Sequence, residues 1–211
     1  MKYYVKTSWD ENVPVRNIYC IGRNYRAHAA ELNNEVPKQP FFFQKSLPSL
    51  NTSREIIVPD NRDIHHELEV VILVQKNGEN INEADVQNHI GGFALGLDLT
   101  DRNFQNELKE KKLPWLLSKS FKGSAVVSRF QSKPIEEDFW LKINGLFRQK
   151  GNVKDMVFSI PKQVSYLSEM IPLLAGDLIF TGTPSGVGPI HTGDKLELGI
   201  GEHSIHSIVV S

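Results

Sequence analysis

The residues best suited to chemistry are two glutamates that begin an apolar strand. In HHELEVVILV, residues 65–74, Glu67 and Glu69 precede a run of aliphatic side chains that predicts a buried strand. Side chains alternate along a strand, so both glutamates point to the same face. Two carboxylates about 4 Å apart repel by roughly 4 kcal/mol at an effective dielectric constant near 20. They therefore need a cation or a raised pKa, and we predict a divalent metal, the alternative being a solvated strand face.

A third acid, Asp98, lies in a second apolar strand, predicted for residues 93–99. Burying a carboxylate without a partner costs free energy, so Asp98 must meet either a cation or backbone N–H donors. As a third oxygen ligand it completes an acidic triad with Glu67 and Glu69. Such an all-carboxylate set is preferred by Mg²⁺ or Mn²⁺.

A histidine and a glutamate form a candidate acid–base pair near the start of the chain. A short strand ends at Gly22, and RAHAAEL, residues 26–32, has the composition of a helix. His28 and Glu31 are three residues apart and so share a helix face, where the carboxylate would hold one imidazole tautomer and raise its basicity. This spacing fits a general base with its orienting group. Taken alone, such a pair is more often an ordinary surface histidine and glutamate.

Other polar residues stand alone in apolar or turn-rich surroundings. Lys45 follows three phenylalanines, and Lys119 lies among apolar and hydroxyl residues. Each lysine either extends to the solvent or faces an anionic ligand. Thr183 lies in TGTPSGVGP, residues 181–189, a turn whose N–H groups could hold a carboxylate or serve only as a turn. That turn lacks the GxxxxGK[ST] pattern of a phosphate loop.

The scaffold is indicated by turn and cap signals. Asn77-Gly78 predicts a two-residue hairpin, and a second hairpin over 139–151 turns at Asn144-Gly145 with Phe147 in the core. Ser159 is the predicted N-cap of a helix. We interpret these elements as support for the residues above.

Composition limits the classes of function. The 211 residues are 40% hydrophobic, enough for one sizeable core, and we expect residues 1–16 to form a strand and connection before a single catalytic domain over 17–211. A net charge of −1 without a basic cluster argues against nucleic acid and anionic membranes as partners. Cys20 is the single cysteine, and no run resembles a signal peptide or a membrane span. We therefore expect a cytoplasmic protein that acts on small molecules.

Five motifs in fixed order resemble the fumarylacetoacetate hydrolase family, and most closely its short acylpyruvate hydrolase and oxaloacetate decarboxylase branch. The motifs are IGRNYRAHAAE, HHELEVV, GLDLTDRNFQ, LPWLLSKSF and TGTPSGVGP. The resemblance implies that Glu67, Glu69 and Asp98 bind Mg²⁺ or Mn²⁺, and it gives His65 no ligand role. It further implies that His28 and Glu31 form a catalytic dyad on a closing lid and that Lys119 is a catalytic lysine. The substrate contacts that it implies are Arg23, Lys45, Gln105 and Thr183.

The resemblance also implies an overall architecture, an α+β fold dominated by strands. This fold is a mixed β-roll or sandwich with a few short helices, assembled as a homodimer. The chain departs from fumarylacetoacetases proper, because the segment from Val15 to His28 has no acid where they carry an aspartate. We therefore do not expect fumarylacetoacetate itself to be the substrate.

The function that these residues imply is a metal-dependent hydrolase. It would cleave a carbon–carbon bond in acylpyruvate-type 2-oxo acids by way of a pyruvate enolate held at the metal. Alternatives are an oxaloacetate decarboxylase and an isomerase or tautomerase of a 2-oxo diacid. A protein that binds 2-oxo acids in a metal-dependent manner without turning them over is an alternative of another class.

Overall fold

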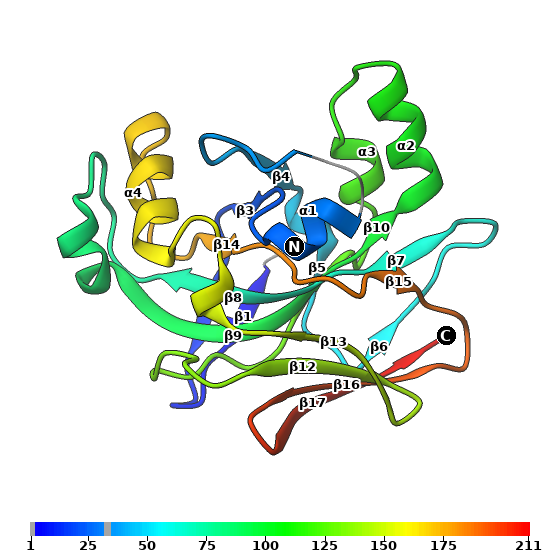
Figure 1. Ribbon diagram of the computed structural model, residues 1–211. Coiled ribbons are helices and arrows are strands. Elements are labelled where there is room, and N and C mark those ends of the chain that lie inside the picture. Colours follow the sequence, from blue (N-terminus) through cyan, green and yellow to red (C-terminus); the bar gives the residue numbers. More distant parts are fainter. Residues whose placement is uncertain (1–2, 32–34) are drawn as a thin grey trace.

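A mixed sheet of seven strands forms the centre of the computed structural model, which describes residues 3–31 and 35–211 (Figure 1). The order of its strands is β4 (Phe42–Lys45), β3 (Ile18–Ile21), β14 (Leu178–Phe180), β8 (Leu68–Val74), β9 (Ile90–Asp98), β11 (Ala125–Val127) and β5 (Leu50–Asn51). The long antiparallel pair β8–β9 runs through its middle and curves across the molecule. Within the described part of this sheet, parallel pairing is confined to β3–β14 and β5–β11.

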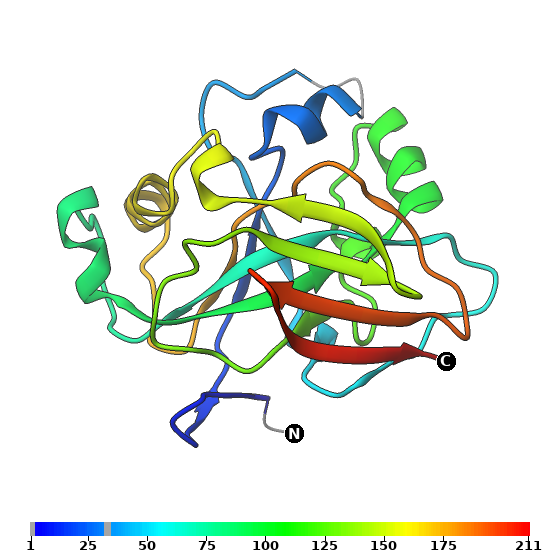
Figure 2. The same ribbon diagram turned by 60° about the horizontal axis from the view of Figure 1, so that its bottom comes forward.

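A second sheet packs against the first and lies in the foreground of Figure 2. Its order is β13 (Leu146–Gly151), β12 (Phe139–Ile143), β16 (Lys195–Ile200), β17 (His203–Val210) and β6 (Glu55–Ile56). Two smaller sheets complete the described strands, namely β10 (Thr100–Asp101), β7 (Ile64–His66) and β15 (Gly188–Pro189), and the hairpin of β1 (Tyr4–Lys6) and β2 (Asn12–Pro14).

Short helices lie around the sheets. They are α1 (Arg26–Glu31), α2 (Arg102–Glu110), α3 (Leu116–Lys119) and α4 (Ile160–Met170), with 3₁₀ turns η1 (Leu47–Ser49), η2 (Glu83–Asn88) and η3 (Val153–Asp155). Figure 1 shows α1 over the middle of the molecule, α2 and α3 together on one side, and α4 on the other. Among the described helices, none is long and apolar enough to cross a membrane.

Strand β8 is buried on both faces, as its sequence predicted. Leu68, Val70 and Ile72 join the large core between the two main sheets. Val71 and Leu73 point the other way, into a smaller core beneath the curled central sheet. Full burial on both faces accounts for a continuous apolar run in place of a polar alternation.

Two hairpin predictions had different outcomes. The hairpin β12–β13 turns at Asn144-Gly145, both with positive φ, as predicted. Phe147 is 62% exposed, so its predicted place in the core was wrong: it lies on the outer face of an edge strand, against Trp140 at 5.7 Å between ring centroids. The prediction of a two-residue turn at Asn77-Gly78 was also wrong, because the connection from β8 to β9 contains η2 and Gly78 pairs with Leu173.

The predicted helix boundaries agree with the structure where they are described. Ser159 caps α4, since its hydroxyl accepts a hydrogen bond from the Lys162 N–H at 3.3 Å. Helix α1 covers the His28 and Glu31 positions, and Leu32, the last residue of the predicted helix, lies outside the described residues.

Candidate functional site

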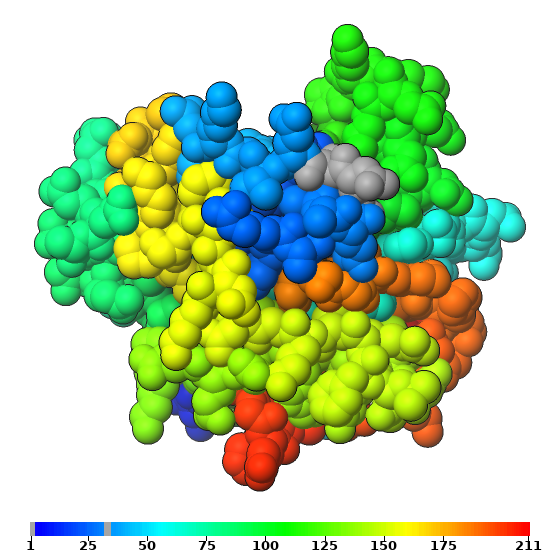
Figure 3. All heavy atoms as spheres, in the orientation of Figure 1, coloured from blue at the N-terminus to red at the C-terminus, as the bar shows by residue number. Residues whose placement is uncertain are grey.

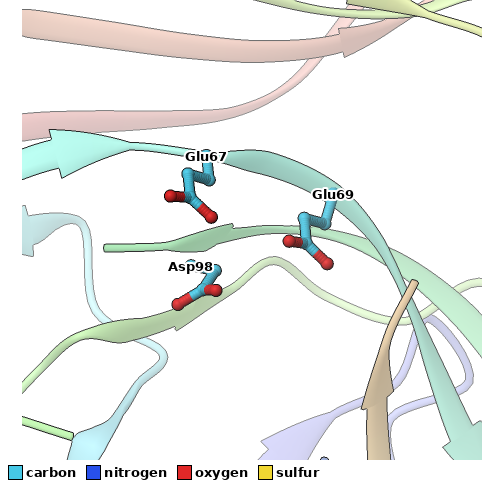
Figure 4. A group of neighbouring side chains, drawn as sticks. All are labelled: Glu67, Glu69 and Asp98. Atoms are coloured by element: carbon cyan, nitrogen blue, oxygen red, sulfur yellow. The ribbon is translucent and has the colours of Figure 1, made fainter. Parts of the chain in front are cut away.

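The three predicted metal ligands meet at the junction of two neighbouring strands. Glu67 precedes β8, Glu69 lies within it, and Asp98 ends the antiparallel strand β9. The register places Asp98 beside Glu67, because the Asp98 N–H donates to the Glu67 carbonyl oxygen at 2.9 Å. Figure 4 shows the three carboxylates converging, and one oxygen from each lies within 4.8 Å of the others. All three residues are buried.

Buried cations already balance part of this negative charge. Lys119 Nζ lies 2.8 Å from Glu67 Oε2 and 2.7 Å from Asp98 Oδ2, and so bridges the two acids. Arg102 donates from Nη2 to Glu67 Oε1 at 2.5 Å, and the Thr100 hydroxyl donates to the same oxygen at 3.0 Å. Burial opposes ionisation of Glu67, but Lys119 and Arg102 outweigh burial and hold its pKa well below the usual range.

Glu69 carries the least compensated charge of the triad. Its Oε2 accepts one hydrogen bond, from the Gly182 N–H at 2.6 Å. Burial and then the charges of Asp98 and Glu67 raise the pKa of Glu69 well above its usual range. A cation between the three carboxylates would relieve this repulsion.

The donor set fits a hard divalent cation. Asp98 Oδ1 is 2.7 Å from Lys45 Nζ, yet it receives no hydrogen bond of good geometry. Carboxylate oxygens with unused lone pairs are the ligands that Mg²⁺ and Mn²⁺ prefer. The triad is therefore a candidate divalent metal site, held by Glu67, Glu69 and Asp98.

Lys45 lies behind this site and does not line the pocket. Its ammonium donates to the carbonyl oxygens of Lys119, Leu99 and Ser124 as well as facing Asp98. An ammonium has three protons, so these acceptors leave none for a ligand. The geometry gives Lys45 a part in neutralising Asp98, and the substrate contact implied for it stays a prediction.

The His28–Glu31 pair forms on α1. His28 Nδ1 is 3.3 Å from Glu31 Oε2, which leaves Nε2 as the nitrogen that can exchange a proton. Glu31 is itself fixed, because its Oε1 accepts from the Gly186 N–H at 3.0 Å. The blue atoms of α1 accordingly abut the orange atoms of the segment after β14 in Figure 3. Burial lowers the pKa of His28, although Glu67 and Glu31 act in the opposite direction, so the ring is neutral at pH 7.

Two acids of the triad and the histidine of the dyad open into one pocket, whereas Asp98 and Glu31 do not line it. The predicted site residues that line it are Arg23, His28, Glu67, Glu69, Gln105, Lys119 and Thr183. Gln105 is oriented within it, because its Oε1 accepts from Arg102 Nη1 at 2.8 Å and leaves its NH₂ group as a donor. The chain therefore gathers residues from β8, α1, α2, α3 and the segment after β14 around a single small volume.

Thr183 is oriented by a buried amide that the sequence did not single out. Gln149 on β13 accepts from the Leu68 N–H at 2.9 Å through Oε1, which fixes the orientation of its amide. His66 Nδ1 lies 2.8 Å from the same oxygen, so it must be the ring nitrogen that carries the proton and donates it. The Gln149 NH₂ group donates to Thr183 Oγ1 at 2.8 Å and to the Pro184 carbonyl oxygen at 2.9 Å. Because Thr183 accepts this bond, its own proton points either to the Pro184 carbonyl oxygen, 3.4 Å away, or into the pocket.

Three further lining residues, Arg102, Lys109 and Trp115, were missed from the sequence. Arg102 had a detectable signal, since it precedes Gln105 by three residues in GLDLTDRNFQ and so shares its helix face. Lys109 extends the same face by a further turn. Trp115 stands in the motif LPWLLSKSF, but its place in the pocket was not predicted. Nothing local marked Gln149, because its importance comes from segments distant in sequence.

A family model described as fumarylacetoacetate (FAA) hydrolase C-terminal matches residues 17–209. The chain belongs to this family. Among its relatives, a mitochondrial oxaloacetate tautomerase of Mus musculus is 45% identical over 194 residues, which cover 88% of this chain and 87% of that protein. A mitochondrial oxaloacetate decarboxylase of Dictyostelium discoideum is 40% identical over 193 residues, covering 88% of both chains.

The fold agrees with that of solved members. A fumarylpyruvate hydrolase from Pseudomonas aeruginosa, crystallised with Mn²⁺ and pyruvate, superposes with a TM-score of 0.93 at 32% identity and covers 99% of this chain and 95% of that chain. A family protein from Yersinia pestis CO92 has a TM-score of 0.94, also at 32% identity, and covers 99% of this chain and 100% of its own. The predicted strand-dominated α+β fold is thereby confirmed.

The predicted cytoplasmic location is contradicted by these comparisons. Relatives that match most of the chain at 40–45% identity are mitochondrial proteins. A single buried cysteine is compatible with any reducing compartment, so composition had no means of choosing between them.

Proposed function

We propose that this protein is a divalent-metal-dependent enzyme that interconverts the enol and keto forms of oxaloacetate. The observation that carries the proposal is the buried acidic triad, of which Glu67 and Glu69 line the same pocket as His28, the histidine that Glu31 orients. A metal site alone supports binding, whereas a neutral, oriented imidazole beside it supports proton transfer. The relatives named oxaloacetate tautomerase support this choice of substrate.

A divalent cation at the triad would supply a Lewis acid that polarises the 2-keto group of the substrate. The chain's own residues move the proton. His28 is neutral at pH 7 and is held by Glu31. Its Nε2 accepts the proton of the enol hydroxyl group and returns it to carbon 3, which gives the keto form. Lys119 places a positive charge next to the oxygen on which negative charge develops. Thr183 donates its hydroxyl proton to a substrate carboxylate.

The charge balance of the site favours a dianionic substrate. Three buried cations face the three acids of the triad, and they are Lys45, Arg102 and Lys119. With every acid ionised, this set is neutral, so a divalent cation adds two positive charges. A 2-oxo diacid cancels two of the positive charges that then face the pocket, whereas a monoanionic acylpyruvate cancels one; Arg23 and Lys109, which also line the pocket, add to this positive charge.

Hydrolysis of an acylpyruvate is the second candidate, and the likeness to a fumarylpyruvate hydrolase with bound pyruvate favours it. In this reaction His28 takes a proton from water, which attacks the distal carbonyl, and cleavage of the carbon–carbon bond releases pyruvate. Decarboxylation of oxaloacetate, the activity named for the Dictyostelium relative, needs no attacking water. The three reactions share the same charged site.

The deciding experiment measures the loss of oxaloacetate enol and of acetylpyruvate, each with and without Mg²⁺ or Mn²⁺. We expect metal-dependent ketonisation of oxaloacetate, with slower loss of acetylpyruvate. Metal-dependent loss of acetylpyruvate alone would favour the hydrolase. No turnover of either compound, together with metal-dependent oxalate binding, would identify a non-catalytic 2-oxo acid-binding protein and overturn the proposal. The implied homodimer stays a prediction, which light scattering of the purified protein tests.

A further inference from the structure

The outer part of the pocket holds two cations that no acidic side chain of the described residues neutralises. Arg23 and Lys109 both line the pocket and are both half-buried. Neither makes an ion pair in the part of the chain that the structure describes, residues 3–31 and 35–211. Arg102 and Lys119, deeper in the same pocket, are both paired with Glu67. Two half-buried positive charges without a counter-ion are costly until an anion binds between them.

Arg23 is held in place by an unusual backbone. Its φ is 56°, in the left-handed region that residues other than glycine rarely adopt. The next residue, Asn24, is fully buried. Its amide NH₂ group donates to the carbonyl oxygens of Thr181 and Phe158, and its amide oxygen accepts from the Phe158 N–H. Such an anchored, strained position is typical of residues whose direction matters for binding.

Lys109 reaches the pocket from helix α2, whereas Arg23 follows strand β3. Arg102, Gln105 and Lys109 follow one another at spacings of three and four along α2, so they share one helix face. Lys109 Nζ lies 5.3 Å from the ring centroid of Trp115. Burial, followed by the charge of Arg102, lowers the pKa of Lys109 to about 8.

Aromatic contacts bring the two cations together. Arg23 lies over the ring of Phe41 at 5.8 Å, and Phe41 meets Trp115 edge to face with 5.9 Å between centroids. The cations therefore lie on adjoining rings, Arg23 on Phe41 and Lys109 on Trp115, and Trp115 lines the pocket. An aromatic wall positions the charged groups without neutralising them, which suits an anion site.

We propose that Lys109, together with Arg23, binds the second carboxylate of a dianionic 2-oxo acid, and that Lys109 is the residue by which the site prefers diacids to monoacids. This inference rests on the proposed function, since the triad is taken to hold the 2-oxo acid end. The inner carboxylate and keto group lie at the triad, and the distal carboxylate reaches the outer cations. The proposal adds a specificity-determining residue that no sequence motif marked.

The test uses the variant Lys109→Met, which keeps an unbranched side chain against Trp115 and removes the positive charge. We expect KM for oxaloacetate to rise about tenfold, the loss typical of one charge-assisted hydrogen bond, with kcat and the KM for acetylpyruvate nearly unchanged. Lys109→Arg should restore most of the loss. Lys111→Met is the matched control, because Lys111 is exposed just beyond the same helix and the substitution makes the same change in net charge.

A binding measurement separates this inference from the proposed function. By calorimetry with Mg²⁺, malate should bind the unmodified protein about tenfold more tightly than lactate, and Lys109→Met should remove that difference. Equal affinities in the unmodified protein, or equal losses for both ligands in the variant, would overturn the distal carboxylate site. Absence of turnover with this binding preference intact would contradict the proposed activity and support the site. Equal melting temperatures confirm that the variant is folded.

Discussion

Replacing Gln149 with alanine should weaken both the fold and the site. Gln149 is 2% exposed, and its amide makes four hydrogen bonds of 2.8–2.9 Å, to Leu68, His66, Thr183 and Pro184. Two of them hold the start of β8 next to Glu67, and two hold the segment that carries Thr183. At about 1 kcal/mol for each bond, the variant should lose about 4 kcal/mol of unfolding free energy.

Urea denaturation followed by circular dichroism measures this loss as a lower midpoint at an unchanged slope. Gln131→Ala is the control, because the Gln131 amide makes one exposed hydrogen bond, to the Lys133 carbonyl oxygen, and its removal should cost less than about 0.5 kcal/mol. A loss below about 1 kcal/mol for Gln149→Ala would refute the reasoning, since it would mean that water replaces the amide at little cost. We also expect weaker oxalate binding, because Thr183 loses its fixed orientation.

Three further predictions concern the triad and the dyad. His28→Ala should reduce turnover at least 100-fold while Mg²⁺ and oxalate affinities stay nearly intact, and unchanged activity would contradict the assignment of the dyad. Glu69→Gln should remove metal-dependent oxalate binding in calorimetry, and equal binding in the variant would contradict the triad. Because burial lowers the pKa of His28, the fall of kcat/KM on the acid side should begin only below pH 6.5, as the ring gains a proton and ceases to be a base; an acid-side fall that begins above pH 6.5 would count against His28.

Much of the site was predictable because strand and helix periods act over a few residues. The alternation of HHELEVVILV placed Glu67 and Glu69 on one face, and the spacing of three placed His28 beside Glu31. Both pairs occur in the structure as expected. Asp98 was recognisable as the acid in an apolar strand, where an uncompensated charge is costly.

Local patterns failed where the neighbour of a strand was unknown. Phe147 has the same apolar character as the buried residues of β12, yet it faces solvent, because β13 is an edge strand and none of the described elements covers its outer face. Asn77-Gly78 has the composition of a tight turn, but the pairing of Gly78 with Leu173 forms a longer connection. Sheet order decides such cases, and a short stretch of sequence does not contain it.

By itself, the sequence determined which residues carry charge into the core and which of them share a face. Only the tertiary structure decided how these charges are balanced: the register of β8 and β9 sets Asp98 beside Glu67, and α3 brings Lys119 between them. The same closure leaves Arg23 and Lys109, at the outer part of the pocket, without acidic partners among the residues that the structure describes. The physical reason is range, because backbone periodicity acts within a few residues whereas charge compensation depends on segments that meet only when the sheets close.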